Sequence, residues 1–192
     1  CTAYGTVTFK YDDPKAKNVE VDVQFAGRNP MTKGADGVWT ATLGPAAPDM
    51  YPYCFVVDGV SVMDPLCPQY FPNEGFKNSL LEIPAENGSL AHDIKNVPHG
   101  KVEYLHYYSK SLKGVNNAIV YLPPKYETDK NKKYPVFYLL SGTTDTEEVY
   151  YKVGRVNYIL DNLIAEGKAV EMIVVLPYGN PTKLLPPAPA PA

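Results

Sequence analysis

A polar loop at residues 141–148 gathers side chains that could do chemistry. It reads Ser-Gly-Thr-Thr-Asp-Thr-Glu-Glu, so four hydroxyls, a glycine and three carboxylates lie close together. Carboxylate oxygens are the ligands that hard cations prefer. Asp145, Glu147 and Glu148 have no further ligands nearby in the sequence, however, and acidic residues also favour the amino end of a helix. We therefore interpret them as surface charge and predict no bound metal.

The segments on either side of this loop indicate how it is positioned. The apolar run 134–140, bounded by Pro135 and Gly142, predicts a strand buried on both faces. After the loop, apolar residues recur at helical spacing and form one stripe: Val153, Val156, Leu160, Leu163 and Ile164. Gly167 then marks a helix end, and the run 172–176 predicts a second buried strand. This order implies a parallel pair with a right-handed crossover, and ligands gather beyond the carboxyl ends of such strands.

Four pieces of this region resemble a known enzyme family. They are Leu139-Leu-Ser-Gly142, Gly154-Arg-Val-Asn157, the run 159–168 and Ile173-Val-Val-Leu-Pro177. In order and spacing they are similar to the front part of the feruloyl and acetylxylan esterases, which form family one of the carbohydrate esterases. The resemblance implies an α/β-hydrolase fold, of which residues 101–183 are the N-terminal part.

The resemblance also implies a role for the loop after the first parallel strand. In this family that loop supplies one backbone N–H of the oxyanion hole, the donor group that stabilises the developing alkoxide. By position, this role falls to Gly142 and the amide of Thr143. The sequence departs from the family at Ser141, where a histidine is usual. Tyr150, or its neighbour Tyr151, stands where the family often has tryptophan, and we expect Tyr150 to contact substrate.

The residues that would attack an ester are missing from this sequence. A serine hydrolase of this fold needs Gly-x-Ser-x-Gly at a strand-to-helix turn, followed by an acid and a histidine. The nearest approach, around Ser61, lacks the second glycine and lies in a predicted hairpin. His92, His99 and His106 all precede the place of the nucleophile, and we interpret them as linker and strand surface. We expect no catalytic side chain within these residues, and no ester hydrolysis by this chain alone.

The first part of the chain predicts an all-β domain. The runs 5–11, 19–25 and 38–43 alternate between apolar and polar residues, and Asp58-Gly59 is a strong hairpin signal. Short strands at this spacing favour an immunoglobulin-like sandwich. The pattern from Asp36-Gly-Val-Trp39 to Asp64-Pro65 resembles the early-set carbohydrate-binding modules of family forty-eight. Trp39 either stacks on a sugar ring or fills the sandwich core, and the core interpretation is favoured.

A long aromatic loop at residues 65–77 interrupts this domain. It contains Tyr70, Phe71 and Phe76, and exposed aromatic side chains of this kind usually pack against something. We interpret the loop as facing the second domain. The loop either helps to wall the acyl or sugar pocket of the esterase, with these three residues in contact with substrate, or serves only in interdomain packing.

These observations divide the chain into four parts. Residues 1–88 form the sandwich, 89–100 a linker, 101–183 the esterase part, and 184–192 a Pro/Ala-rich loop or cleavage segment. Val97-Pro-His-Gly100 also stands at the domain boundary of the resembling esterases. The esterase sheet is incomplete, and an open strand edge promotes aggregation. Three explanations fit: the chain is the first piece of an enzyme cleaved in the Pro/Ala-rich segment, with the C-terminal esterase fragment still bound; it is a truncation; or its edge pairs with a second copy. The first two are favoured.

The composition of the chain limits which partners, cofactors and disulfides can be expected. The 192 residues have a formal net charge of −3 and no clustered basic surface, which argues against a nucleic-acid partner. No apolar run approaches the roughly 20 residues of a membrane span, and we expect no cofactor. With three cysteines, Cys54 and Cys67 could form one disulfide, but free thiols are favoured. Cys1 could carry the lipid of a bacterial lipoprotein, or simply be the first residue of the sequence.

We therefore predict the N-terminal part of a secreted, periplasmic or cell-surface feruloyl (or acetylxylan) esterase. It would act on plant cell-wall polysaccharide, feruloylated arabinoxylan, by serine hydrolase chemistry, with its nucleophile, acid and histidine outside this chain. The alternative is a non-catalytic glycan-binding protein that retains an esterase-like remnant.

Overall fold

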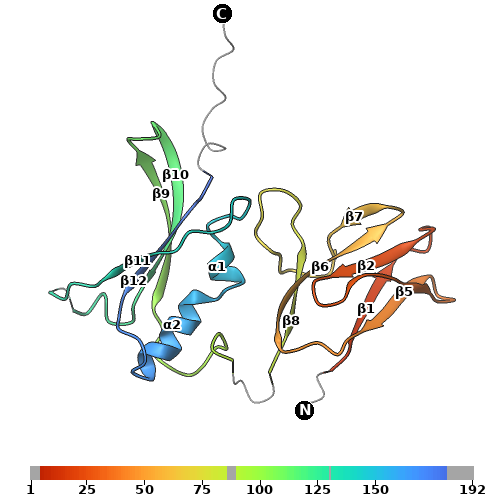
Figure 1. Ribbon diagram of the computed structural model, residues 1–192, viewed down its shortest axis with the longest axis horizontal. Helices are drawn as coiled ribbons and strands as arrows, with labels where there is room; N and C mark the ends of the chain where they lie inside the picture. The colour runs from red at the N-terminus through yellow and green to blue at the C-terminus, as the bar shows by residue number, and fades with distance from the viewer. Residues whose placement is uncertain (1–4, 86–89, 130, 181–192) are drawn as a thin grey trace, which may run out of the picture. The chain divides into compact units, whose positions relative to one another are not determined.

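The computed structural model describes residues 5–85, 90–129 and 131–180, and it divides into two compact units (Figure 1). Among the described residues, the first unit comprises 5–71 and 76–85, and the second comprises 72–75 together with the residues from 90 onward. Cys1 and the Pro/Ala-rich segment 184–192 lie outside the described residues. No described helix is long and apolar enough to cross a membrane.

The first unit contains two antiparallel sheets. One has the order β1 (Val7–Asp12), β5 (Val38–Leu43), β4 (Thr32–Lys33). The other runs β3 (Gly27–Pro30), β2 (Val19–Val23), β6 (Asp49–Val57), β7 (Val60–Val62), and β8 (Ser79–Ile83) also pairs with β6. The Asp58-Gly59 hairpin is confirmed, because Val57 pairs with Val60 and both turn residues have positive φ, 48° and 87°. The sequence analysis missed β3 and β4, whose residues do not alternate between apolar and polar.

The core of the first unit lies between its two sheets. The alternation of β2 places Val19, Val21 and Val23 inside, each with 0% exposure. Trp39 belongs to the same core, is 7% exposed, and donates its indole N–H to the Asp13 carbonyl at 2.9 Å. This burial agrees with the core interpretation of Trp39 and leaves little of the ring for a sugar to contact.

The cysteines of the first unit are free thiols. Cys54 is buried and Cys67 is half-buried, as the sequence analysis favoured. Burial raises the pKa of the Cys54 thiol, with a further contribution from the charge of Asp22, so the neutral form is stabilised.

The second unit contains one mixed sheet. Its order is β11 (Val136–Tyr138), β12 (Ile173–Pro177), β10 (Gly114–Leu122), β9 (Lys101–Ser109). The predicted parallel pair is confirmed, because β11 and β12 are parallel neighbours, with Val136 opposite Ile173. The other two pairings are antiparallel.

Helix α2 (Val156–Ala165) packs against this sheet (Figure 1). Leu160, Val156 and Ile164 from the predicted stripe contact a core made by β10 and β12. Val153 lies outside α2, however, and ends the short helix α1 (Val149–Lys152). The predicted single helix is therefore divided, because Arg155 between the two adopts a left-handed conformation with φ of 48°.

The prediction that residues 134–140 form a strand buried on both faces is wrong. Val136 is 48% exposed, Phe137 49% and Tyr138 63%. The physical reason is position, since β11 is the edge of the sheet and has a single neighbour. The open edge therefore lies at β11, whereas β12 is interior, with Val174 and Leu176 at 0% and 1% exposure.

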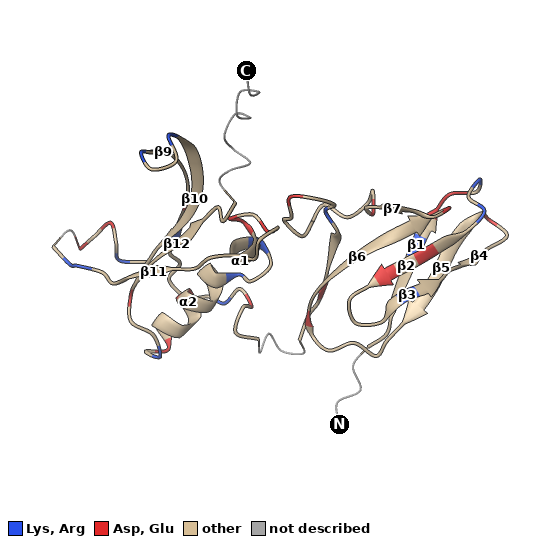
Figure 2. Ribbon diagram, turned by 45° about the horizontal axis from the view of Figure 1, so that its top comes forward, with Lys and Arg blue, Asp and Glu red and all other residues tan. Residues whose placement is uncertain are grey.

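Charged residues of both signs are interspersed along the chain. Figure 2 shows Lys and Arg alongside Asp and Glu in the loops of the second unit. Several form exposed ion pairs, such as Lys101 with Glu103 at 3.0 Å and Lys101 with Glu127 at 3.2 Å. Exposed pairs of this kind contribute little to stability.

Candidate functional site

The loop at residues 141–148 begins just past the carboxyl end of β11, and residues 178–180 follow β12. Because β11 and β12 are parallel, both segments lie at the same edge of the sheet. A Cβ built on Gly179 would lie 3.7 Å from the Ser141 Oγ, which places the two segments side by side. Among the described residues, this edge is the candidate site.

The loop contains a tight turn from Gly142 to Asp145. The Asp145 N–H donates to the Gly142 carbonyl at 3.1 Å, and the Ser141 hydroxyl donates to the Asp145 carbonyl at 3.3 Å. A Cβ on Gly142 would lie only 3.1 Å from Asp145 Oδ2, so a larger residue would crowd the turn. The absence of a side chain at position 142 therefore suits the turn.

The amides of Gly142 and Thr143 are available as donors at this turn. Both residues are exposed, and no described residue accepts a hydrogen bond from either N–H group. An amide that is to bind an incoming oxygen must meet this condition, since a donor already paired within the protein could not serve that oxygen.

Residues 72–75 hold the second half of the turn. The Glu74 N–H donates to the Thr144 carbonyl at 2.8 Å, and the Thr146 N–H donates to the Pro72 carbonyl at 3.4 Å. The Asn73 side-chain amide donates to Thr144 Oγ1 at 3.1 Å and to Asp145 Oδ1 at 3.2 Å. Pro72 is fully buried. These four residues therefore form part of the second unit, although the chain on both sides belongs to the first.

Glu74 also contacts the end of β12. The Tyr178 hydroxyl donates to Glu74 Oε1 at 2.5 Å, and the Asn180 side-chain amide donates to Glu74 Oε2 at 3.3 Å. Burial, followed by the hydrogen bond and the charge of Glu74, raises the pKa of Tyr178 to about 12. The phenol is therefore a neutral donor to a carboxylate at physiological pH.

Two of the three carboxylates of the loop, Asp145 and Glu148, have protein partners. Glu148 forms an ion pair with Lys152 at 3.0 Å and accepts a hydrogen bond from the Tyr104 hydroxyl at 3.2 Å. Burial, followed by the charge of Glu148 and this hydrogen bond, raises the pKa of Tyr104 to about 12. Asp145 accepts a hydrogen bond from Asn73, and both Asp145 and Glu148 are half-buried.

The predicted substrate-contacting residues are divided between the units. Tyr70, Phe71 and Phe76 belong to the first unit, and Phe76 is 45% exposed. Tyr150 lies in α1 and is half-buried against the core of the second unit. Of the predicted residues, the second unit brings together Gly142, Thr143 and Tyr150, each on or directly after the same loop.

A second polar cluster surrounds the buried carboxylate of Asp161, which is 1% exposed. Asp161 Oδ1 accepts hydrogen bonds from the Tyr121 hydroxyl at 2.7 Å and from the Gly100 N–H at 2.8 Å. Asp161 Oδ2 lies 2.8 Å from Nδ1 of His99. Burial, followed by the hydrogen bond to Asp161, raises the pKa of Tyr121. The cluster thereby joins α2, β10 and the segment before β9.

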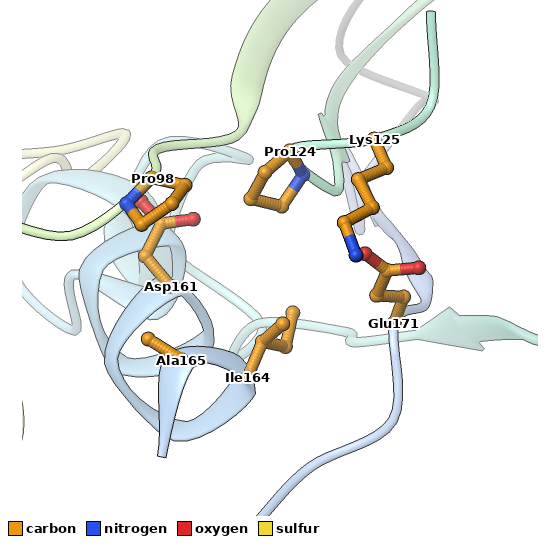
Figure 3. A pocket seen from close by; sticks show the side chains of 7 residues that line it. All are labelled: Pro98, Pro124, Lys125, Asp161, Ile164, Ala165 and Glu171. Carbon is orange, nitrogen blue, oxygen red and sulfur yellow. The ribbon is translucent and has the colours of Figure 1, made fainter. Parts of the chain in front are cut away.

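Asp161 also borders a pocket of about 260 Å³ in the second unit. Figure 3 shows Pro98 and Asp161 on one side of it, and Lys125 and Glu171 on the other. Glu171 precedes β12 and Lys125 follows β10, so the pocket lies toward the amino ends of the parallel strands. It is therefore separate from the edge that carries Gly142 and Thr143.

The sequence analysis missed two groups of residues. His99 was interpreted as linker, but the structure pairs it with Asp161. The same linker is also bonded to α2, because the carbonyls of Ala91 and Asp93 accept hydrogen bonds from the Asn162 side chain, each at 2.9 Å. Asn73 and Glu74 were not identified at all. Their only sequence signal was their position in the aromatic loop, because hydrogen bonds between distant segments leave no local pattern.

Three comparisons relate this chain to known proteins. Residues 109–186 match the family model described as "Putative esterase". The chain is 34% identical over 181 residues to the endo-1,4-beta-xylanase/feruloyl esterase of Xylanibacter ruminicola, an alignment that covers 91% of this chain and 25% of that protein. It is 37% identical over 70 residues to endo-1,4-beta-xylanase Y of Acetivibrio thermocellus, covering 36% of this chain and 6% of that protein.

Among solved structures, the enterobactin esterase of Shigella flexneri in the presence of enterobactin is similar, with a TM-score of 0.62 and 20% identity. The match covers 90% of this chain and 52% of that one, and at this identity it shows a shared fold alone. The chain thus spans a quarter of the length of its xylanase/feruloyl esterase relative and about half of this esterase structure.

Proposed function

We propose that this chain is the N-terminal part of an esterase of the feruloyl esterase type. The first unit is an early-set sandwich of the carbohydrate-binding-module kind, and the second is the front of an α/β-hydrolase domain. The observation that carries the proposal lies at the carboxyl edge of the parallel strands, where no described residue accepts a hydrogen bond from the amides of Gly142 and Thr143. The similarity to a xylanase/feruloyl esterase over 91% of the chain supports the same conclusion.

The chemical role of this chain is to stabilise charge. Attack on an ester carbonyl produces a tetrahedral intermediate with a negative oxygen, and the amides at the turn donate hydrogen bonds to that oxygen. One such donor contributes about 3 kcal/mol to lowering the barrier. The Ser141 hydroxyl is not the nucleophile, because it donates to the Asp145 carbonyl and no described histidine contacts it. The nucleophile, acid and histidine lie outside these 192 residues.

The substrate class we propose is the esters of plant cell-wall xylan, such as feruloylated arabinoxylan. This rests on the similarity to the endo-1,4-beta-xylanase/feruloyl esterase of Xylanibacter ruminicola. Tyr70, Phe71, Phe76 and Tyr150 are the proposed substrate contacts, and the 45% exposure of Phe76 makes its ring available. A polymeric substrate lies outside the cell, so the proposal includes a secreted, periplasmic or cell-surface location.

The open edge at β11 requires a partner. Val136, Phe137 and Tyr138 expose apolar side chains on a strand with a single neighbour. An edge of this kind pairs readily with another strand. The partner we propose is the remaining C-terminal part of the esterase, and a second copy of this chain is the alternative.

The proposal is tested by a proline substitution at the turn. Thr143 follows the first residue of the turn, a position that proline favours, so Thr143→Pro removes the N–H with little change of backbone shape. In a full-length polypeptide that contains this chain, we expect kcat on methyl ferulate to fall about 100- to 1,000-fold. Thr143→Ala retains the N–H and should stay within a few-fold of the wild-type protein. Equal activity of the two variants would show that the amide does not stabilise the transition state.

A second measurement tests where the reacting side chains lie. Residues 1–192 alone should show no turnover of methyl ferulate, whereas the full-length polypeptide should hydrolyse it. Hydrolysis by the isolated chain, free of any second fragment, would contradict the proposal.

A further inference from the structure

We propose that Asn73 and Glu74 are positioning residues, which hold the Gly142–Asp145 turn in the conformation that presents its amides to the ester oxygen. This inference rests on the proposed function and extends it to residues far from the turn in the sequence. Both residues belong to the 72–75 segment, which the structure groups with the second unit.

Hydrogen bonds to the 72–75 segment fix one half of the Gly142–Asp145 turn. Its amide donors come from Gly142 and Thr143, and its other half, Thr144 and Asp145, makes the contacts to the segment. Thr144 is bonded through both its carbonyl and its side chain, the first to the Glu74 N–H and the second to Asn73. Because a tight turn has few free dihedral angles, fixing Thr144 and Asp145 also fixes the direction of the preceding amides.

The 72–75 segment is itself held in place by contacts with the residues that follow β12. The Glu74 carboxylate accepts hydrogen bonds from Tyr178 and Asn180, which follow β12. Tyr178 is 8% exposed and Glu74 is half-buried, so this contact is partly shielded from water, and a hydrogen bond to a charged group is stronger there than on an open surface. Glu74 therefore connects the two strand ends of the site, the turn through its backbone and the end of β12 through its side chain.

The rigidity of this turn bears directly on the proposed catalysis. An oxyanion donor is effective only when it is fixed in advance, because reorientation during the reaction would offset the gain. Among the described residues, Ser141 makes a contact within the loop itself, whereas residues 72–75 hold the turn by hydrogen bonds from a distant part of the chain. Removing these hydrogen bonds should therefore lower kcat more than it changes KM.

The kinetic test uses the full-length polypeptide. Glu74→Ala and Asn73→Ala should each lower kcat on methyl ferulate about 10- to 100-fold, with KM changed less than about threefold. Glu74→Gln keeps an oxygen that can accept from Tyr178, and should give an intermediate kcat. Glu127→Gln, in the exposed loop after β10, is the matched control and should match the wild-type protein. A rise in KM with unchanged kcat would overturn the positioning role, as would no change in either constant.

Tyr178→Phe approaches the same contact from the other side. It removes only the hydroxyl, so it tests the same hydrogen bond even if the Glu74→Ala protein fails to fold. If the hydrogen bond positions the turn, Tyr178→Phe should reproduce most of the loss of kcat, and adding it to Glu74→Ala should cause little further loss. Fully additive losses would contradict the proposed connection.

Hydrogen exchange separates this inference from the proposed function. In residues 1–192, Glu74→Ala and Asn73→Ala should accelerate amide exchange in peptides covering 141–148, with exchange in α2 unchanged. Unchanged exchange at 141–148 would overturn the inference even if the full-length protein is an esterase. An inactive full-length wild-type protein would instead overturn the proposed function and with it the catalytic role, while exchange would still decide whether the segment holds the turn.

Discussion

Nδ1 of His99 lies 2.8 Å from Oδ2 of Asp161, a carboxylate that is 1% exposed. The same carboxylate also accepts hydrogen bonds from Tyr121 and Gly100. One side chain of α2 thus fixes the start of β9 and the side chain of a core tyrosine on β10. The cluster is a structural support of the second unit, at the opposite end of the parallel strands from the candidate site.

Removing this carboxylate should destabilise the second unit. In Asp161→Ala, the Gly100 N–H and the Tyr121 hydroxyl lose their acceptor, at a cost of about 1–3 kcal/mol for each buried donor. Asp161→Asn keeps one oxygen for these donors and should cost less. Urea unfolding followed by far-UV circular dichroism measures both, and the fluorescence of Trp39 reports on the first unit. Equal stabilities of the two variants would contradict this role of the carboxylate.

Gly100→Ala should be destabilising for a steric reason. A Cβ at this position would lie 2.4 Å from the Leu122 carbonyl oxygen and 2.4 Å from the Tyr121 ring, both closer than van der Waals contact. Overpacking of this kind costs about 1–3 kcal/mol. Gly5→Ala is the matched control, because nothing lies within 4 Å of its Cβ. Thermal unfolding should show a lower Tm for Gly100→Ala only.

Tyr178 should make stability depend on alkaline pH. Its pKa is raised from 10.0 to about 12 in the folded chain. Between these values the unfolded chain releases a proton that the folded chain retains, so the free energy of unfolding falls as pH rises from 10 to 12. Below pH 10 the contribution is fully present. We expect Tyr178→Phe to flatten this part of the stability profile, measured by urea unfolding at each pH.

Glu74→Gln tests the cause of the shift in pKa. Removing the negative charge beside the phenol should lower the pKa of Tyr178. Tyrosinate absorbance, compared between this variant and the wild-type protein, should show one tyrosine that titrates earlier. Identical titration curves would show that Glu74 does not act on Tyr178.

A charge on the β11 edge should reduce self-association of residues 1–192 but destabilise the full-length polypeptide. Phe137→Lys places a cation on β11, and a charged edge strand resists pairing with another chain. In residues 1–192 alone, we expect less concentration-dependent association by sedimentation. In the full-length polypeptide, where the edge would be covered, the same change should lower stability. Val170→Lys, at a residue 66% exposed outside the strands, is the control and should have neither effect.

Trp39 should not respond to added glycan. It is the single tryptophan of the chain and is 7% exposed, so its fluorescence should not change with xylo- or malto-oligosaccharides. Unfolding in urea should shift its emission and serves as the positive control. A glycan-dependent shift would instead favour sugar stacking and the glycan-binding alternative.

The order of the elements could be predicted from the sequence, because it depends on local patterns. The alternation of Val19, Val21 and Val23 indicated a strand with one buried face, and Asp58-Gly59 indicated the hairpin that joins β6 and β7. The similarly apolar run around Phe137 was predicted to be buried on both faces but is exposed. Hydrophobicity records which residues favour burial, not whether a neighbouring strand is present to bury them.

The amino-acid sequence alone therefore determined most strands of the two units and the helical segment after the loop, and it pointed to Gly142 and Thr143 through a local resemblance. Only the tertiary structure decided which residues support that turn, since Asn73 and Glu74 lie about 70 residues earlier in the chain. The same holds for His99, whose partner Asp161 lies on α2. The physical reason is that propensity and periodicity act between near neighbours, whereas the hydrogen bonds of a site form between segments that only folding brings together.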